Sequence, residues 1–224
     1  MDPGLQGKRA LVTGSTAGIG FAAARALAAE GVQVTVNGRT APRVNAAVAR
    51  LKADLPGATV TGVSADLGTA DGCEVMIQLR PELDILVNNL GIFEPKPFEE
   101  ISDADWLRFF ETNVLSGVRL TRHYLRGMRQ RNWGRVVFVS SESAVQIPAE
   151  MIHYGMTKTA QLAISRGLAE TLAGTGVTVA GLGHYRSRAS GRWRGDSVRR
   201  VRSCVKRRPA YDPEGLRAAA STIA

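Results

Sequence analysis

The sequence predicts a doubly wound α/β fold, in which one parallel sheet lies between two layers of helices. Short runs rich in β-branched and aliphatic residues alternate with longer stretches in which apolar residues recur with a period near 3.6. Glycines stand at several breaks, where a helix must end before the next strand begins. The 224 residues are enough to bury a sizeable core and suit one such domain better than two.

The alternation runs without an internal repeat from residue 9 to residue 180. The predicted strands are 9–13, 32–36, 58–63, 84–88, 135–140 and 177–180. The predicted helices are 19–30, 42–54, 71–79, 103–131 and 154–173. Four of these helices are followed by a glycine, at Gly31, Gly57, Gly134 and Gly176. This order of elements indicates a Rossmann-like, three-layer α/β/α domain over residues 1–183.

Residues 184–224 depart from this pattern. Only five of these 41 residues are Leu, Ile, Val or Phe, and residues 184–208 carry ten basic side chains against one acidic. So few large apolar side chains with so much charge predict an atypical, disordered Arg-rich tail and a sheet that lacks its last strand. Two explanations stay open, a genuinely divergent segment or an out-of-frame translation of a GC-rich gene. We favour the second.

The net charge of +9 comes from this tail, because residues 1–183 carry 18 basic and 17 acidic side chains. The domain therefore gives no sign of a nucleic-acid partner. No apolar run approaches the ~18 residues that cross a membrane, and we expect no membrane partner. Cys73 and Cys204 are too few for a disulfide framework, which predicts a cytoplasmic protein. His123, His153 and His184 lack ligand spacing, so we expect no metal site.

A glycine-rich turn follows the first predicted strand and opens the first helix, with the sequence Thr-Gly-Ser-Thr-Ala-Gly-Ile-Gly over 13–20. Glycines let the backbone approach a phosphate closely, and the helix N-terminus offers free N–H groups. The candidate cofactor-binding residues of this turn are Gly14, Ser15, Thr16, Gly18, Ile19 and Gly20. A glycine turn alone is weak evidence, and its strand–turn–helix context strengthens it.

The next strand ends in Asn37-Gly38-Arg39, where an acidic residue would bind the adenosine ribose hydroxyls. The guanidinium of Arg39 could instead hold a 2′-phosphate, which favours NADP(H) over NAD(H). The alternative is a solvated loop arginine.

Tyr154 and Lys158 stand one turn apart on one face of the last predicted helix. An ammonium 4–5 Å from the phenol would lower its pKa of roughly 10 by about two to three pH units, into the range of a useful acid/base. Ser141 ends the strand before this helix and could bind a substrate oxygen. Each feature alone has an ordinary explanation, a chance pair on a helix surface or a Ser-rich turn.

Together these features resemble the short-chain dehydrogenase/reductase family in its single-domain form, over residues 5–180. Asn88-Asn89-Leu90-Gly91 is similar to the family's Asn-Asn-Ala-Gly motif, with Leu90 in place of Ala. Asn113 matches its fourth catalytic position, and the pair Asp66-Leu67 resembles the one that contacts adenine. The cofactor-binding residues that the resemblance adds are Asp66, Leu67, Asn88, Gly91, Tyr154 and Lys158.

The resemblance implies an NAD(P)-dependent oxidoreductase that transfers a hydride between the nicotinamide and a small carbonyl or alcohol substrate. Tyr154 would exchange the proton with the substrate oxygen, and Ser141 would orient the carbonyl. Lys158 would hold the nicotinamide ribose and lower the Tyr154 pKa, while Asn113 would hold a water that links Lys158 to solvent. It also implies a homodimer or homotetramer that pairs helices 103–131 and 154–173.

The resemblance ends after the strand at 177–180. The family's Asn-x-Val-x-Pro-Gly turn is missing there, because Ala180 stands in place of the Asn and no Pro-Gly follows. A second function therefore stays open, a catalytically impaired nucleotide-binding or scaffold protein that has lost its C-terminal cover region.

Overall fold

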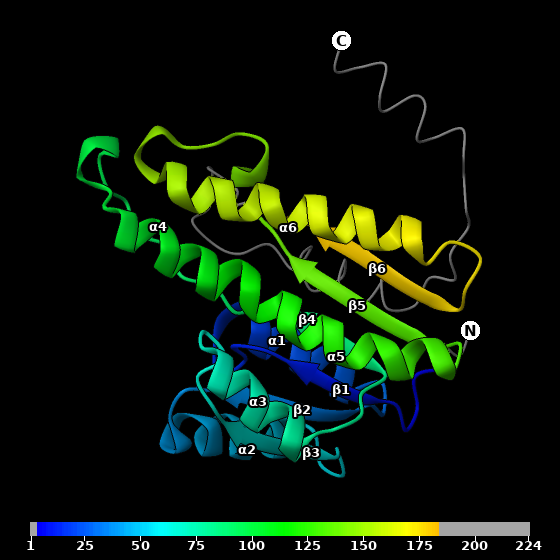
Figure 1. Ribbon diagram of the computed structural model, residues 1–224. Coiled ribbons are helices and arrows are strands. Elements are labelled where there is room, and N and C mark those ends of the chain that lie inside the picture. The colour runs from blue at the N-terminus through cyan, green and yellow to red at the C-terminus, as the bar shows by residue number, and fades with distance from the viewer. Residues whose placement is uncertain (1–3, 184–224) are drawn as a thin grey trace.

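The computed structural model describes residues 4–183, which form one six-stranded sheet with helices on both faces (Figure 1). All strands are parallel, in the order β3-β2-β1-β4-β5-β6. The strands are β1 Arg9–Val12, β2 Gln33–Gly38, β3 Val60–Ser64, β4 Ile85–Asn88, β5 Gly134–Val139 and β6 Val177–Leu182. The predicted fold class, a Rossmann-like doubly wound sheet, is confirmed.

The helices occupy the connections between consecutive strands, as parallel pairing requires. They are α1 Gly18–Ala28, α2 Ala41–Asp54, α3 Ala70–Leu79, α4 Asp103–Phe110, α5 Ser116–Gln130 and α6 Ile152–Thr171. Short 3₁₀ turns lie at η1 Phe98–Glu100, η3 Glu142–Ala144 and η4 Ala149–Met151. None of the helices within residues 4–183 is long and apolar enough to cross a membrane.

Side chains alternate along each strand between two apolar cores, one on each face of the sheet. In β5, Val137 and Val139 pack into the core under α1 and α2, whereas Val136 and Phe138 pack into the core under α3, α5 and α6. Figure 1 shows α5 and α6 running across the same face of the sheet. Burial on both faces explains why the predicted strands read as nearly continuous apolar runs.

The strand order places β1 between β2 and β4, so the connections leave β1 and β4 in opposite directions across the sheet. In such sheets a crevice opens outside the carboxyl ends of the strands at this switch point. The glycine turn follows β1 there, and the Asn88–Gly91 motif follows β4. The topology therefore brings the candidate site residues together at the carboxyl ends of the strands.

The predicted helix over 103–131 differs from the structure, because five residues between α4 and α5 form a wider π-helical turn, η2 Glu111–Leu115. Asn113 lies in this turn, and its side chain bonds to residues outside the helix instead of pointing to solvent. Such π turns often occur at functional sites. Periodicity could not reveal this turn, because the apolar face continues on both sides of it.

The structure extends β6 to Leu182, two residues beyond the predicted end, and Gly181 and Leu182 continue the pairing with β5. Within residues 4–183 the sheet ends at β6. The expectations of a disordered Arg-rich tail and of a missing last strand concern residues 184–224, which lie outside the described residues.

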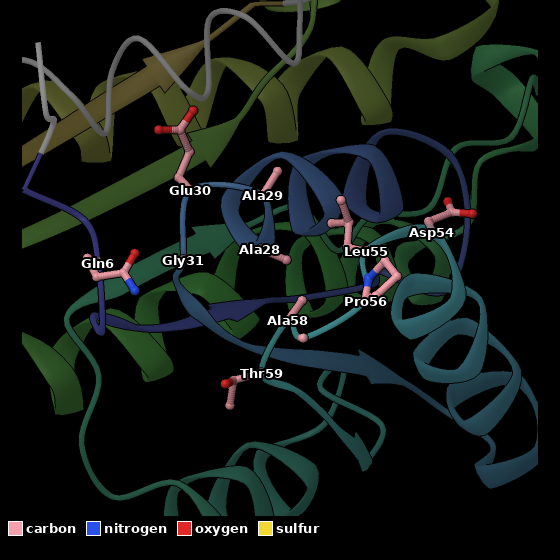
Figure 2. Close-up of a pocket in the computed structure, with 11 residues that line it drawn as sticks. Gln6, Ala28, Ala29, Glu30, Gly31, Asp54, Leu55, Pro56, Ala58 and Thr59 are labelled. Carbon is pink, nitrogen blue, oxygen red and sulfur yellow. The ribbon is translucent and has the colours of Figure 1, made fainter.

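A pocket of about 580 Å³ lies at the opposite, amino-terminal ends of the strands, where α1 and α2 end and β2 and β3 begin (Figure 2). Backbone and small side chains form most of its wall, with Gln6, Glu30 and Asp54 at its rim. It shares no residue with the motifs described above, so the candidate active site lies elsewhere.

Candidate active site

The turn between β1 and α1 has the geometry of a phosphate cradle. Gly14 and Gly18 adopt φ values of +59° and +57°, which side chains with a Cβ rarely adopt. A Cβ on Gly20 would lie 2.5 Å from the Asn89 amide nitrogen and 2.6 Å from the Gly14 carbonyl oxygen, so this helix start can approach the β4 loop only with glycine.

A dinucleotide phosphate fits this turn. Ala17 precedes α1 and provides no side-chain cap, so the first N–H groups of the helix have no side-chain acceptor. A Cβ on Gly18 would meet no atom within 4 Å among the described residues, which means that the backbone faces open space. Free N–H groups and the positive end of the helix dipole both favour an anion.

Asn37, at the end of β2, holds this turn in place. Its Oδ1 accepts from the Gly14 N–H at 3.2 Å, and its Nδ2 donates to the Val63 and Ala65 carbonyls at 3.3 and 3.1 Å. Its backbone N–H donates to the hydroxyl of Ser15, which in turn donates to the Val12 carbonyl. Sequence reasoning treated Asn37 only as a neighbour of Arg39; its buried polar position at a strand end was the available signal.

The residues predicted to bind adenosine lie at the ends of β2 and β3. The side chain of Arg39 is exposed, and its carbonyl accepts from the Ser64 hydroxyl. Asp66 is also exposed and accepts from the Gly68 N–H, whereas Leu67 is only 1% exposed. The Leu67 side chain therefore belongs to the core, and only its backbone is left for a ligand.

The Asn88–Gly91 motif connects the glycine turn with the catalytic candidates. The Asn89 side chain donates to the carbonyls of Thr13 and Gly14, both at 3.0 Å. Asn88 is buried and donates to the Thr121 hydroxyl, so its side chain braces α5. A Cβ on Gly91 would lie 3.5 Å from both the Asn113 Oδ1 and the Lys158 Nζ, which brings this loop directly against the site.

Ser141, Tyr154 and Lys158 come together as the spacing predicted. Ser141 follows β5, and the two other residues lie on the first turns of α6, with the Lys158 Nζ 5.6 Å from the centre of the Tyr154 ring. The Ser141 hydroxyl accepts from the Ser143 N–H at 3.2 Å. Ser140 serves a structural purpose, because its hydroxyl donates to the Lys158 carbonyl.

The expected lowering of the Tyr154 pKa by Lys158 is not found in the structure. Burial raises the pKa of the Tyr154 phenol, and the neighbouring Ser141 hydroxyl offsets only part of that effect. Burial also lowers the pKa of Lys158 to about 8. The ammonium donates to the Val139 carbonyl at 2.9 Å and to the Gln161 Oε1 at 3.2 Å, so its hydrogen bonds within residues 4–183 go to these groups and not to the phenol.

Asn113 forms hydrogen bonds that connect the loop after β4 with α6. Its Oδ1 accepts from the Ile92 N–H at 2.7 Å, and its Nδ2 donates to the Ile92 carbonyl and to the Thr157 hydroxyl. Its backbone carbonyl accepts from the Gln161 Nε2 at 2.6 Å. Sequence reasoning missed Thr157 and Gln161, although Gln161 stands one turn after Lys158 on the same helix.

Apolar side chains surround the opening of the site. Phe93, Val145 and Ile147 are 73%, 80% and 49% exposed, and the Phe93 ring packs edge-on against Tyr154 at a centroid distance of 6.3 Å. Within the part of the chain that the structure describes, no three His, Cys, Asp or Glu side chains are placed to hold a metal ion.

Known proteins are similar to this chain in sequence and in architecture. Residues 8–185 match the family model of the short chain dehydrogenases. The uncharacterized oxidoreductase YvaG of Bacillus subtilis is 54% identical over 175 residues, which are 78% of this chain and 66% of that protein. The 3-oxoacyl-[acyl-carrier-protein] reductase FabG of Aquifex aeolicus is 36% identical over 183 residues, which cover 80% and 73% of the two chains.

A solved structure agrees with these relatives. The L-sorbose reductase of Gluconobacter frateurii, complexed with NADPH and L-sorbose, superposes with a TM-score of 0.75 and 34% identity. The match covers 81% of this chain and 70% of that one. Since the family model spans most of the chain and its motifs meet at one edge of the sheet, this chain belongs to the short-chain dehydrogenase family.

Proposed function

We propose that the protein is an NADP(H)-dependent oxidoreductase that interconverts a small carbonyl compound and its alcohol. The observation that carries this proposal is the group formed by Ser141, Tyr154 and Lys158 beside a glycine turn that fits a dinucleotide phosphate. The relatives named as an L-sorbose reductase and a 3-oxoacyl reductase support a carbonyl substrate.

Each side chain of the group has a distinct task in this proposal. A bound nicotinamide cofactor supplies the hydride for carbonyl reduction. Tyr154 donates the proton to the substrate oxygen; its raised pKa keeps it protonated at neutral pH. The Ser141 hydroxyl, which lies close enough to influence the pKa of the phenol, orients that oxygen. Lys158 binds the cofactor ribose and provides positive charge near the phenolate that remains after proton transfer.

The substitution Tyr154→Phe tests the assignment, because it keeps the ring and removes the proton. We expect NADPH-dependent reduction of L-sorbose or a 3-oxoacyl thioester to fall by a factor of about 10²–10⁴. Tyr124→Phe is the matched control: it removes a buried phenol that donates to the Arg80 carbonyl on the far side of α5, and should keep full turnover per folded molecule.

The outcomes of this experiment separate the two functions considered. Turnover that survives Tyr154→Phe would overturn the acid/base assignment. A wild-type chain that binds NADPH and reduces none of these carbonyl compounds would instead indicate the nucleotide-binding or scaffold protein.

Arg39 supports a preference for NADP(H), because its exposed guanidinium directly follows β2, which itself ends without an acidic residue. A charge-assisted contact with a 2′-phosphate is worth about 1.5–3 kcal/mol. We therefore expect Arg39→Ala to lower kcat/KM for NADPH by about 10–150-fold and to leave the value for NADH unchanged. Lys52→Ala, which removes an exposed charge at the other end of α2, is the control. A better kcat/KM with NADH in the wild type would contradict the preference.

A further inference from the structure

The side chain of Gln161 connects two parts of the active site that the family motifs treat separately. Its Oε1 accepts from the Lys158 Nζ at 3.2 Å, and its Nε2 donates to the backbone carbonyl of Asn113 at 2.6 Å. Gln161 is 1% exposed, and Lys158 and Asn113 are 4% and 1% exposed. The amide therefore bridges α6 and the π turn η2 in the dry interior, beside Tyr154.

Chemistry determines which way this amide points. An ammonium group only donates hydrogen bonds, and a backbone carbonyl only accepts them. Gln161 can satisfy both neighbours only with Oε1 toward Lys158 and Nε2 toward Asn113. Neither an apolar nor an acidic side chain of similar size can satisfy both at once, because the first lacks both groups and an ionised carboxylate cannot donate to the carbonyl.

Because Lys158 is buried, each hydrogen-bond acceptor of its ammonium matters for the stability of the charged form. The ammonium is buried, and its two hydrogen-bond acceptors among residues 4–183 are neutral, the Val139 carbonyl and the Gln161 amide. No charged side chain of the described residues shifts the pKa of Lys158, which burial alone lowers. A buried cation without a carboxylate depends on such dipoles to stay protonated.

Several ionisable groups lie on α6 or on the elements packed against it, and Tyr154 is the one in ring contact with the Lys158 ammonium among the described residues. Four charged side chains gather around His153, where α4 packs on the start of α6; they are Glu94, Lys96, Asp105 and Arg108. Glu111 of η2 pairs with Arg119. Arg166 and Glu170 are exposed further along α6. None of these charges shifts the pKa of Lys158, and the groups that accept hydrogen bonds from its ammonium are the neutral Val139 carbonyl and Gln161 amide.

We propose that Gln161 is a positioning residue of the active site, which links the Lys158 ammonium to the Asn113 carbonyl and keeps the ammonium protonated beside Tyr154. The role of Gln161 in catalysis rests on the proposed function, since only a reaction that uses Tyr154 needs the positive charge of Lys158. A purely structural role, the attachment of α6 to η2, would leave the titration of Lys158 unaltered.

The test is an NMR titration of the Lys158 side chain in the full chain, followed through its Cε and Nζ resonances, which Lys158→Met identifies by their loss. In Gln161→Leu we expect the pKa of Lys158 to fall by about one to two pH units, since one hydrogen bond to a charged group is lost. In Gln161→Glu we expect it to rise above the wild-type value, because a carboxylate then faces the ammonium. Ser165→Ala, a buried polar residue one turn further along α6, should leave it unchanged.

The pH profile of carbonyl reduction gives a second readout. The alkaline limb of kcat should move to lower pH in Gln161→Leu by about the same amount as the Lys158 pKa. An unaltered Lys158 titration in a folded Gln161→Leu chain would overturn the proposal. If that variant does not fold, Gln161→Glu decides in the same way, because an unchanged pKa beside a new carboxylate contradicts the contact.

Failure of the proposed function would look different. The titration needs no turnover, so activity that survives Tyr154→Phe removes the acid/base assignment, while an altered Lys158 pKa in the Gln161 variants still supports the contact. The reverse result, activity lost in Tyr154→Phe with the Lys158 pKa unaltered in the Gln161 variants, overturns the Gln161 proposal alone.

Discussion

At Lys158, burial opposes the charge that the proposed reaction needs. Its ammonium is buried, its hydrogen-bond partners among residues 4–183 are neutral, and its pKa is lowered from 10.5 to about 8. A group so placed makes folding less favourable as long as it must stay charged. The fold tolerates that cost at the position where the proposed reaction needs a positive charge.

This cost predicts how stability depends on pH at Lys158. Below pH 8 the side chain is charged in both states, and the folded state carries the full penalty of burial. Between pH 8 and 10.5 the folded state has lost the proton that the unfolded state still binds, so stability rises with pH. The free energy of unfolding gained by Lys158→Met, relative to the wild type, should therefore be larger at pH 7 than near pH 10.5 by about 3 kcal/mol.

Urea unfolding of both proteins across this pH range measures the difference. The groups common to both chains cancel in the comparison, so only the Lys158 ionisation contributes to the change with pH. A stability difference between the two proteins that does not vary between pH 7 and 10.5 would show that Lys158 titrates normally.

At the scale of elements, the glycine turn depends on the neighbouring strand ends for its shape. It contains two residues with positive φ and no side-chain cap, so little within the turn itself fixes its conformation. Asn37 provides that restraint from β2, with three side-chain hydrogen bonds to Gly14, Val63 and Ala65. The phosphate cradle is therefore a property of β1, β2 and β3 together.

The substitution Asn37→Leu should loosen this cradle. It leaves the Gly14 N–H and two buried carbonyls without their side-chain partner, which we expect to cost about 2–4 kcal/mol of stability and to weaken NADPH binding at least tenfold. Thr35→Val is the control on the same strand, because its hydroxyl bonds only to Thr61 and Arg80. Urea unfolding and cofactor-fluorescence titration measure the two effects. Wild-type NADPH affinity in a folded Asn37→Leu chain would contradict the role of Asn37.

At the scale of the whole molecule, α6 presents small residues outward while its other side covers β5 and β6. Ala163 is exposed, and a Cβ on Gly167 would meet no atom within 4 Å among the described residues. Small exposed residues allow two helices to approach closely. We propose that this surface contributes to a homodimer or homotetramer in which α5 and α6 pair with their copies across a two-fold axis, as the family resemblance implies.

Ala163→Arg tests self-association without disturbing the monomer core. We expect the wild type to form a homodimer or homotetramer in light scattering, and the variant to shift toward single chains, because two guanidinium groups would meet at the two-fold axis. Ala49→Arg adds the same side chain to an exposed position of α2 and should not alter the mass. A wild-type chain that stays monomeric at high concentration would rule this interface out.

Features that depend on local patterns could be predicted from the sequence. The periodic repeat of apolar side chains predicts the six strands, and short spacings along the chain predict the glycine turn and the one-turn separation of Tyr154 and Lys158. Backbone geometry converts such spacings directly into faces and turns, so these predictions needed no knowledge of distant contacts.

Features that join residues far apart in the sequence became visible in the folded structure alone. The π turn at Asn113 and the Gln161 bridge depend on contacts between residues that lie 44 and 48 positions apart. The raised pKa of Tyr154 and the lowered pKa of Lys158 depend on how deeply each group is buried and on where the ammonium points. Spacing along a helix determines which groups can lie close together. Their pKa values depend on desolvation and on the direction of their hydrogen bonds, which arise only when the helices pack on the sheet.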